Sequence, residues 1–424
     1  MEPPTALGLR AKARCDQLGE APYSEADDHL VRRFLTAAHR AALDALSGWM
    51  EAAGMGVHID PAANLIGRYE GRKAGAPALV IGSHIDTVRN GGRYDGALGV
   101  MLGLECVEAL SAAGIRLSFA IEVIAFGDEE GSRFPSSMVC SRALAGVVDE
   151  QVLTMADGDG VTLAQALIEF GLPADDLTGA AREADTVLAF LEAHIEQGPV
   201  LEAEDLPIGV VSAIAAQERL KVRFSGTAGH AGTTPMSLRR DPGPAAAEAI
   251  LAVERLCAGG EDGLVGTVGR IEALPGAYNV IPGSVTLTLD VRAETEAARD
   301  DAVAEIATAL EAIAQQRGLE LDIQLMQSLP ASPCDPTLTA LLSNAVRQIG
   351  VTPRKLASGA GHDAMVMAGL CPTAMLFIRC AGGISHNPAE SVKPEDVAIA
   401  ARAMLAFIAN LETRQNAWEA ERGE

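Results

Sequence analysis

Residues 77–100, "PALVIGSHIDTVRNGGRYDGALGV", contain the pattern that decides the fold. Residues 77–83 are an apolar run of strand length that ends in small residues, and an apolar stretch with helical spacing follows the loop. His84, Asp86 and Asp95 lie in the glycine-rich loop between them. A surface turn would need the glycines but not these three side chains. A strand, a glycine loop and a helix in this order are typical of the place where open α/β sheets carry their functional groups.

Strands and helices alternate on both sides of this loop. We expect helices over 29–54, 96–111, 336–349 and 393–412, and strands within 58–71 and over 77–83, 117–126, 186–195 and 373–378. Residues 132–185 are acidic and less regular. The alternation predicts an α/β fold with a mixed sheet flanked by helices.

The pattern changes near residue 214. Strands are expected over 216–224, 266–274, 284–293 and 319–325, with helices over 241–257 and 296–316. The order βαββαβ is that of a ferredoxin-like unit, which can fold by itself. Because the first pattern returns after a segment rich in proline and serine, we expect one domain of residues 1–213 and 329–424, with residues 214–328 inserted as a second domain.

Composition limits the classes of function. The 424 residues are enough for about two or three domains. The formal net charge of −24 at pH 7 argues against a nucleic-acid partner, because a basic face could not easily form. No apolar run reaches the roughly 18 residues of a membrane span. Seven scattered cysteines without a CxxC pair, and an N-terminus without a signal-peptide core, predict a cytoplasmic protein.

Five separate segments place His, Asp or Glu after predicted strands or other apolar runs. They contain His84, Asp86, Asp95, Glu129, Glu130, His194, Glu196, Gln197, His362, Asp363 and His386. Zinc and manganese take imidazole and carboxylate ligands, and two neighbouring ions need a bridging ligand, usually a carboxylate. This mixture of side chains therefore predicts a site for two divalent ions.

A role for each group can be suggested from this chemistry. Asp95 is the natural bridging residue. The other ligands would be divided between the ions, His84 with His194 and Glu130 with His386. Glu129, which precedes Glu130, could stay free of metal and act as general base. Asp86 could accept a hydrogen bond from the imidazole N–H of His84 that does not face the metal.

Each of these residues also has a structural interpretation. A pair of glutamates is most often a solvated loop, Glu196 could lie on the surface, and His362 with Asp363 could simply begin a helix. For any one of these residues considered alone, the structural interpretation is the better one. Taken together, five such segments favour the metal site.

The inserted domain has polar residues of its own. His230 lies in a Gly/Thr loop after a predicted strand, Asn279 lies at a turn, and Arg292 ends the following strand. Asn is common in turns for local backbone reasons. Asn279 and Arg292 near one edge of this domain could hold a substrate carboxylate, and His230 could donate a hydrogen bond to an oxyanion.

Six motifs in order resemble a known family from about residue 20 to residue 412. They are "GSHIDTVRNGGRYDGALGV" (82–100), "GDEEGSRF" (127–134), "HIEQGPVLE" (194–202), "GHAGTTPM" (229–236), "NVIPG" (279–283) and "SHNPAES" (385–391). They are similar to the amidohydrolase branch of the di-zinc aminoacylase and carboxypeptidase superfamily. This branch includes allantoate amidohydrolases, N-carbamoyl-L-amino acid hydrolases and β-ureidopropionases.

The resemblance implies a metallopeptidase-like catalytic domain, an inserted lid that also mediates homodimerisation, and two zinc or manganese ions per subunit. The implied metal ligands are His84, Asp95, Glu130, His194 and His386, with Asp95 bridging and Glu129 as general base. The implied substrate contacts are Gln197, His230, Asn279 and Arg292, some of which the lid supplies across the interface of such dimers.

The finer resemblance indicates a substrate. Residues 135–146, "PSSMVCSRALAG", and 375–392, "MLFIRCAGGISHNPAESV", are most similar to allantoate amidohydrolases. They imply hydrolysis of the ureido acid allantoate to ureidoglycine, ammonia and carbon dioxide, a step of purine catabolism. A carboxylate clamp would suit a carbamoyl amino acid equally well.

Three other functions are weaker alternatives. An aminoacylase or dipeptidase is disfavoured by His194, where the peptidase relatives usually carry an acidic ligand. A metal-binding scaffold without activity is disfavoured by the intact Glu129. A nucleotide-binding protein is disfavoured because no P-loop and no spaced GxGxxG follows a strand.

Overall fold

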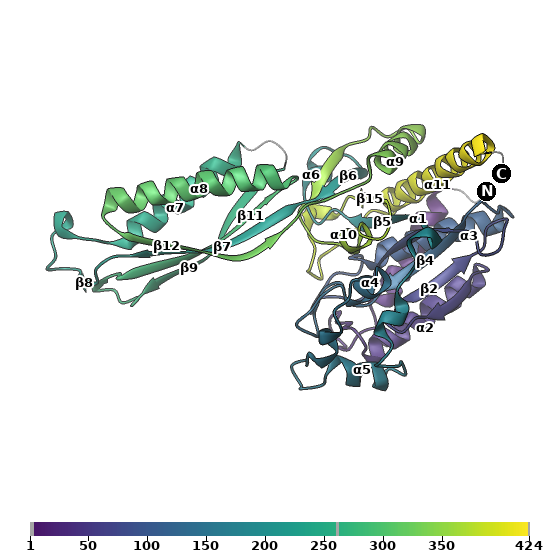
Figure 1. Ribbon diagram of the computed structural model, residues 1–424, viewed down its shortest axis with the longest axis horizontal. Helices are drawn as coiled ribbons and strands as arrows, with labels where there is room; N and C mark the ends of the chain where they lie inside the picture. Colours follow the sequence, from purple (N-terminus) through teal and green to yellow (C-terminus); the bar gives the residue numbers. More distant parts are fainter. Residues whose placement is uncertain (1–3, 260–262, 423–424) are drawn as a thin grey trace. The chain divides into compact units, whose positions relative to one another are not determined.

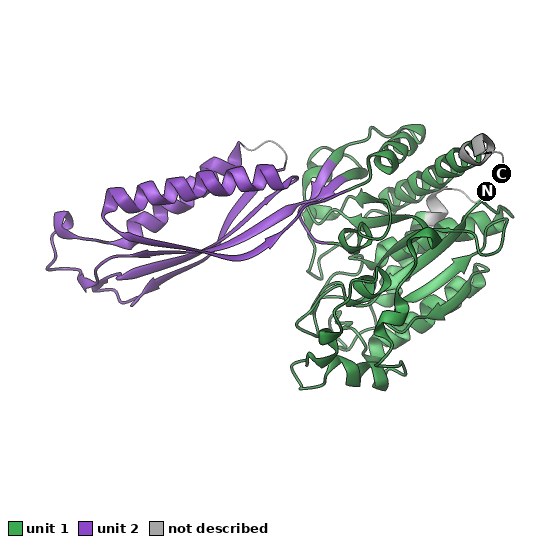
Figure 2. Cartoon of the chain, in the orientation of Figure 1, with its two compact units in different colours: residues 1–211, 334–355, 362–424 green, residues 212–333, 356–361 purple. Residues whose placement is uncertain are grey.

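The structure is a computed structural model that describes residues 4–259 and 263–422, and the chain divides into two compact units (Figures 1 and 2). Unit 1 consists of Met1–Val211, Cys334–Lys355 and His362–Glu424, and unit 2 of Ser212–Pro333 and Leu356–Gly361. Residues 1–3, 260–262 and 423–424 fall in the ranges expected for the two domains but lie outside the described residues.

The larger sheet contains four adjacent parallel strands. Its strands are β1 (Gly56–Ile59), β2 (Leu65–Tyr69), β3 (Ala78–His84), β4 (Ala120–Phe126), β5 (Val187–Ile195), β6 (Ile208–Ile214), β13 (Ser332–Pro333), β14 (Lys355–Ser358) and β15 (Thr373–Ile378). Their spatial order is β1-β2-β4-β3-β5-β15-β6-β13, with β14 also paired to β6. β3 is parallel to β4 and β5, and β5 is parallel to β15, whereas β2 and β6 run antiparallel to their neighbours β4 and β15. The sheet is therefore mixed, as predicted.

Helices cover the central strands of unit 1. They are α1 (Pro4–Leu18), α2 (Ala37–Ala52), α3 (Ala97–Ala112), α4 (Val139–Leu144), α5 (Leu163–Glu169), α6 (Val200–Ala203), α9 (Pro336–Gln348), α10 (Asp363–Met367) and α11 (Pro394–Arg422). α3 packs on β3, β4 and β5 and contacts α1 and α11, whereas α10 contacts β5, β15 and α4. Every residue of β3 and β4 is buried, so both faces of these strands are covered, as is usual for parallel strands.

The helix expected over 29–54 is wrong in its first turns, because α2 begins only at Ala37. The guanidinium of the fully buried Arg32 donates to the backbone carbonyls of Leu18 and Ile85, each at 2.6 Å. These hydrogen bonds hold the preceding segment as a loop, and its apolar residues are buried by tertiary packing. Helix α1 was not expected from the sequence, and the buried apolar side chains described in it are those of Ala11, Cys15 and Leu18.

Unit 2 is an antiparallel sheet with two helices. Its strands are β7 (Ala216–Ser225), β9 (Val265–Leu274), β11 (Ser284–Ala293) and β12 (Glu320–Leu329), in the spatial order β12-β7-β11-β9, and its helices are α7 (Pro242–Ala258) and α8 (Glu296–Arg317). Along the chain these elements have the expected order βαββαβ. A short pair, β8 (Gly229–His230) and β10 (Val280–Ile281), adds a separate two-stranded sheet. Both helices pack on β7 and β11 around one apolar core.

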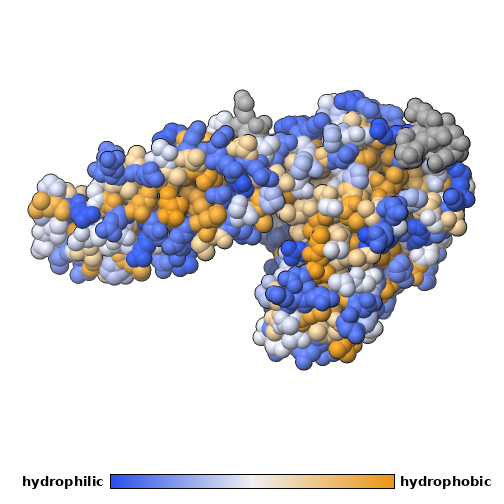
Figure 3. Space-filling view, viewed as in Figure 1, coloured by the Kyte–Doolittle hydropathy of each residue, from blue (hydrophilic) through white to orange (hydrophobic). Residues whose placement is uncertain are grey.

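Unit 2 also exposes large apolar side chains. Leu251 of α7 and Val265, Ile271 and Leu274 of β9 are each more than half exposed. Figure 3 shows orange, apolar surface on this unit. In the described part of the chain, no helix combines the length and the apolar character that a membrane span requires.

Candidate metal centre and catalytic site

The candidate metal ligands follow four adjacent parallel strands at the same edge of the sheet. His84 is the last residue of β3, and His194 is the last but one of β5. Glu129 and Glu130 follow β4, and the turn with His386 follows β15. Because the carboxyl ends of parallel strands meet at one edge, these distant segments come together.

Asp95 lies at the centre of this cluster, just before α3. Its Oδ1 is 3.0 Å from Nε2 of His194 and 3.6 Å from Nε2 of His84. Its Oδ2 is 3.2 Å from Nε2 of His386, and that nitrogen is 3.6 Å from Oε1 of Glu130. The two oxygens of one carboxylate therefore face two different sets of donors, which is the arrangement that a bridging ligand requires.

The donor atoms are close enough to hold cations. Ligand atoms lie within 4.8 Å of one another in three sets: His84, Asp95 and His194; Asp95, Glu130 and His386; and His84, Glu129 and Glu130. Imidazole nitrogens and carboxylate oxygens are ligands that zinc and manganese accept. The residues present thus fit a pair of divalent ions, with Asp95 shared by two of the sets.

Hydrogen bonds orient these ligands. Nδ1 of His194 is 2.8 Å from the carbonyl oxygen of the next residue, and Nδ1 of His84 is 3.1 Å from the carbonyl oxygen of Asp86. These contacts favour a proton on Nδ1 and leave Nε2 of both rings for a cation. The carboxylate of Asp86 is 3.5 Å from the ring of His84, and it accepts the backbone N–H groups of Glu129 and Glu130 at 3.1 and 3.2 Å. Asp86 therefore joins the loops that follow β3 and β4.

Burial and hydrogen bonding move the pKa values of the cluster in opposite directions. Burial raises the pKa of Glu129 well above its usual value and that of Glu130 to about 7. Burial would also raise the pKa of Asp95, but hydrogen bonds with three histidines hold it well below its usual value. The hydrogen bond with Asp95 raises the pKa of His386 to about 9. A cation bound among these carboxyl groups would favour their ionised forms.

Two residues at the centre have left-handed backbone conformations. Gln197 has φ +57° and His386 has φ +53°, which for residues other than glycine costs about 1–3 kcal/mol each. The side-chain amide of Gln197 donates to the two oxygens of Asp95 at 3.3 and 3.2 Å and to Oγ of Ser385 at 3.1 Å. Gln197, expected to contact substrate, thus lies beside the central carboxylate. With these backbone conformations, both side chains contact this carboxylate.

Ser385 and Glu390 contact the cluster, although the sequence did not single them out. Oε1 of Glu390 accepts the backbone N–H groups of Tyr94 and Asp95 at 2.8 and 3.1 Å. Oγ of Ser385 is 3.0 Å from Oδ2 of Asp95 and 3.2 Å from Oε2 of Glu390. Both residues belong to the motif at 385–391, but only the tertiary structure places that turn against the loop of Asp95.

The structure also shows the surroundings of Glu196, His362 and Asp363, whose roles the sequence left open. The carboxylate of Glu196 accepts two backbone N–H groups at the start of α6 at 2.8 and 2.9 Å. His362 precedes α10, and its ring packs edge-on against that of His194, with 4.4 Å between the ring centroids. Asp363 is buried, which raises its pKa to about 8. Among the described residues, none of the three belongs to the donor sets around Asp95.

The candidate substrate contacts in unit 2 lie at opposite ends of its sheet. The N–H after His230 donates to the carbonyl of Asn279 at 2.9 Å, beside the Ser284 end of β11. Arg292 is near the other end of β11. Eight residues of strand, at ~3.3 Å each, separate the two ends by about 26 Å. The expectation that Asn279 and Arg292 share one edge of a single unit is therefore wrong.

Arg292 is held by the carboxylate of Asp290. Its Nε and Nη2 are 2.8 and 3.0 Å from the two oxygens of Asp290, and its Nη1 donates to the carbonyl of Gly359. Asp290 also accepts hydrogen bonds from Arg219 at 2.9 Å and from Gln217 at 2.8 Å. These contacts fix the guanidinium plane of Arg292 within unit 2.

Comparisons by sequence and by structure find similar proteins of one kind, namely peptidases of family M20/M25/M40 and amidohydrolases. Residues 80–410 match the sequence model described as peptidase family M20/M25/M40. An N-carbamoyl-L-amino acid amidohydrolase of Geobacillus stearothermophilus is 41% identical over 397 residues, covering 94% of this chain and 97% of that protein. An allantoate deiminase of Arabidopsis thaliana is 40% identical over 428 residues, covering 94% and 81%. The crystal structure of an amidase of the hydantoinase/carbamoylase family from Burkholderia multivorans has a TM-score of 0.87 and 35% identity, covering 95% and 97%.

Proposed function

This chain belongs to the peptidase family M20/M25/M40, and we propose that it is a metal-dependent amidohydrolase that cleaves the carbamoyl C–N bond of a small ureido carboxylate. The geometry of Asp95 carries the proposal, because its two oxygens face separate sets of imidazole and carboxylate donors. The proposed metal ligands are His84, Asp95, Glu130, His194 and His386, and the proposed ions are zinc or manganese. When bound, such ions would polarise the carbamoyl group and lower the pKa of a water molecule.

Glu129 is the proposed general base. Its Oε2 is 4.0 Å from Nε2 of His84, and it lies outside the two sets that share Asp95. It would accept a proton from the attacking water and then deliver this proton to the leaving nitrogen. His230 would donate a hydrogen bond to the oxygen of the tetrahedral intermediate.

The substrate carboxylate would be held by Arg292 and Asn279. A guanidinium and an amide can together satisfy a carboxylate with directed hydrogen bonds. Allantoate is the first candidate substrate, giving ureidoglycine, ammonia and carbon dioxide. An N-carbamoyl-L-amino acid is the second, because relatives named for each reaction are 40% and 41% identical to this chain.

We also propose a homodimer in which each substrate site takes residues from two copies of unit 2. Support comes from β11, whose length separates Arg292 from Asn279 and His230 by about 26 Å in one copy. A single substrate molecule could contact both groups only if one of them came from the partner.

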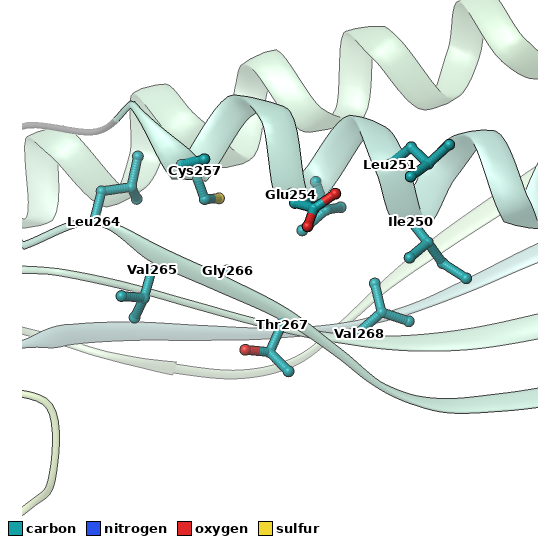
Figure 4. A pocket seen from close by; sticks show the side chains of 11 residues that line it. Ile250, Leu251, Glu254, Cys257, Leu264, Val265, Gly266, Thr267 and Val268 are labelled. Atoms are coloured by element: carbon teal, nitrogen blue, oxygen red, sulfur yellow. The ribbon is translucent and has the colours of Figure 1, made fainter. Parts of the chain in front are cut away.

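An exposed face of unit 2 is suited to such an association. β9 ends the strand order of its sheet, so in the described residues its outer edge has no paired strand. Figure 4 shows an apolar groove between α7 and β9, lined by Ile250, Cys257, Val265 and Val268 among others. Open strand edges and apolar grooves favour pairing with another chain.

A panel of substrates tests the proposed reaction. Ammonia release would be measured from allantoate, from several N-carbamoyl-L-amino acids and from N-carbamoyl-β-alanine, with amine release from N-acetyl amino acids and dipeptides beside them. We expect turnover of at least one carbamoyl substrate and little of the acyl substrates. Preferential cleavage of the acyl substrates would instead favour an aminoacylase or dipeptidase.

Arg292→Ala is expected to raise KM for the carboxylate substrate by about 10- to 100-fold, because a hydrogen bond to a charged group contributes ~1.5–3 kcal/mol. Steady-state kinetics on the substrate and on its carboxamide analogue would measure this. The matched control is Arg219→Ala, which removes the other arginine bound to Asp290. An unchanged KM in the Arg292 variant, or an equal change in both variants, would contradict the carboxylate contact.

Mixing two impaired variants tests the shared site, with activity measured at a substrate concentration far below the raised KM of Arg292→Ala, where each variant alone turns over little substrate. In a dimer of an Arg292→Ala chain and a His230→Ala chain, one of the two sites would combine an intact Arg292 with an intact His230 of the partner. Random mixing is therefore expected to restore about a quarter of wild-type activity, measured after subunit exchange. If each site took both residues from one chain, both sites of the mixed dimer would be defective and no activity would return.

A further inference from the structure

We propose that Glu390 is a positioning residue that clamps the loop of Asp95 to the turn of His386 and thereby keeps the second cation site assembled. The inference deepens the proposed function, because it rests on the metal centre assigned above. The structural basis of the proposed clamp is the set of hydrogen bonds that the side chain of Glu390 accepts.

The contacts of Glu390 reach both segments. One oxygen, Oε1, accepts the backbone N–H groups of Tyr94 and Asp95 at 2.8 and 3.1 Å. The other, Oε2, is 3.2 Å from the hydroxyl of Ser385, and this hydroxyl is 3.0 Å from Oδ2 of Asp95. One buried side chain thus fixes the main chain that carries Asp95 and, through Ser385, the direction of its carboxylate.

The position of Gly92 independently indicates that the loop of Asp95 lies close to the carboxyl group of Glu390. A Cβ built at Gly92 would lie 2.0 Å from Cδ of Glu390 and 2.2 Å from both of its oxygens. Gly92 is not among the residues with a left-handed backbone, so its conformation does not require glycine. Any larger side chain at this position would have to displace the carboxyl group of Glu390, because the loop approaches it so closely.

The two cation sites differ in how their histidines are held. His84 and His194 belong to strands, are buried, and have their Nδ1 atoms near backbone carbonyls. His386 lies in a turn, has a left-handed backbone, and its side chain is 51% exposed. The sheet therefore fixes the first pair, whereas the position of His386 relative to Asp95 depends on the contacts of the turn. Loss of the clamp should weaken the set of Asp95, Glu130 and His386 selectively.

The test compares Glu390→Ala with Glu390→Gln and with the control Glu412→Ala. Gln at 390 keeps an oxygen that can accept both N–H groups and an amide that can contact Ser385. Glu412 also accepts a backbone N–H and a serine hydroxyl, both from Ser118, at 2.8 and 2.7 Å. Ser118 precedes β4, at the end opposite the site, so Glu412→Ala removes the same kind of contact elsewhere.

Two measurements would be made on the full-length protein. Equilibrium dialysis against Mn²⁺ or Zn²⁺, followed by metal analysis, gives the affinity of each ion. Hydrogen exchange of the metal-free protein reports directly on the N–H groups of Tyr94 and Asp95. In Glu390→Ala we expect the second ion to bind about 10- to 100-fold more weakly, the range for residues that orient metal ligands, while the first ion is retained. Exchange at residues 94–95 should accelerate by at least about tenfold.

Glu390→Gln should restore both readouts, and Glu412→Ala should leave both unchanged. Gly92→Ala, which keeps the carboxylate but pushes it away, should resemble Glu390→Ala and provides a second variant if that protein does not fold. Wild-type affinity for both ions together with slow exchange at 94–95 in the alanine variants would overturn the proposal. If the wild type bound two ions but hydrolysed no carbamoyl substrate, the proposed reaction would fail while the clamp stood. If it bound no pair of ions, hydrogen exchange would still decide whether the clamp exists.

Discussion

Glu129→Gln is expected to lower kcat by about 10²- to 10⁴-fold, the usual contribution of a general base, while both metal ions stay bound. Glutamine has nearly the same shape as glutamate but cannot accept the proton of the attacking water. The backbone N–H of residue 129 would keep its hydrogen bond with Asp86, which is 3.1 Å long, so the loop should not move. Steady-state kinetics with metal analysis of the same preparation would measure both effects.

The outcome of this substitution separates two roles for Glu129. It belongs to one set of close donor atoms, with His84 and Glu130, so a role as a ligand is a real alternative. Loss of an ion in Glu129→Gln would indicate a ligand, and retained turnover would remove it from the role of base. Glu196→Gln is a matched control, because Glu196 is a nearby buried carboxyl group whose hydrogen bonds are at the start of α6.

Removal of metal by a chelator is expected to abolish hydrolysis, and Mn²⁺ or Zn²⁺ should restore it. The reason is that the proposed mechanism depends on the bound ions to polarise the carbamoyl group and to lower the pKa of the attacking water. Turnover would be followed after dialysis against chelator and again after each ion is returned. Preserved turnover in protein with no measurable metal would contradict the proposed mechanism.

Chelation should also lower the thermal unfolding midpoint. A ligand that binds only the folded state stabilises it by about 2.7 kcal/mol at a concentration one hundred times its dissociation constant. Removing the ions leaves the carboxyl groups of Asp95, Glu129 and Glu130 close together without a compensating cation. A midpoint that does not depend on the concentration of added Mn²⁺ or Zn²⁺ would argue against ions bound at this cluster.

Much of the fold could be predicted from the sequence, because its signals are local. The apolar run before His84, the loop and the apolar helix after Asp95 all lie within 77–112 and form β3, the loop and α3. The βαββαβ order of unit 2 was likewise readable from alternation and helical spacing. The failure at 29–36 has a long-range cause, since the hydrogen bonds of Arg32 to Leu18 and Ile85 keep that segment from continuing α2.

The sequence by itself determined the types of donor and their positions after strands, because a motif keeps its residues together along the chain. Only the tertiary structure decided that Glu390 contacts the loop of Asp95, since a glutamate in a turn carries no sign of its burial or its partners. The tertiary structure also decided that Asn279 and Arg292 lie at opposite ends of β11, because strand length converts a short separation in sequence into a long distance in space. The residue types of the site could thus be read from short motifs, whereas the distances between functional side chains depended on how the strands and turns pack.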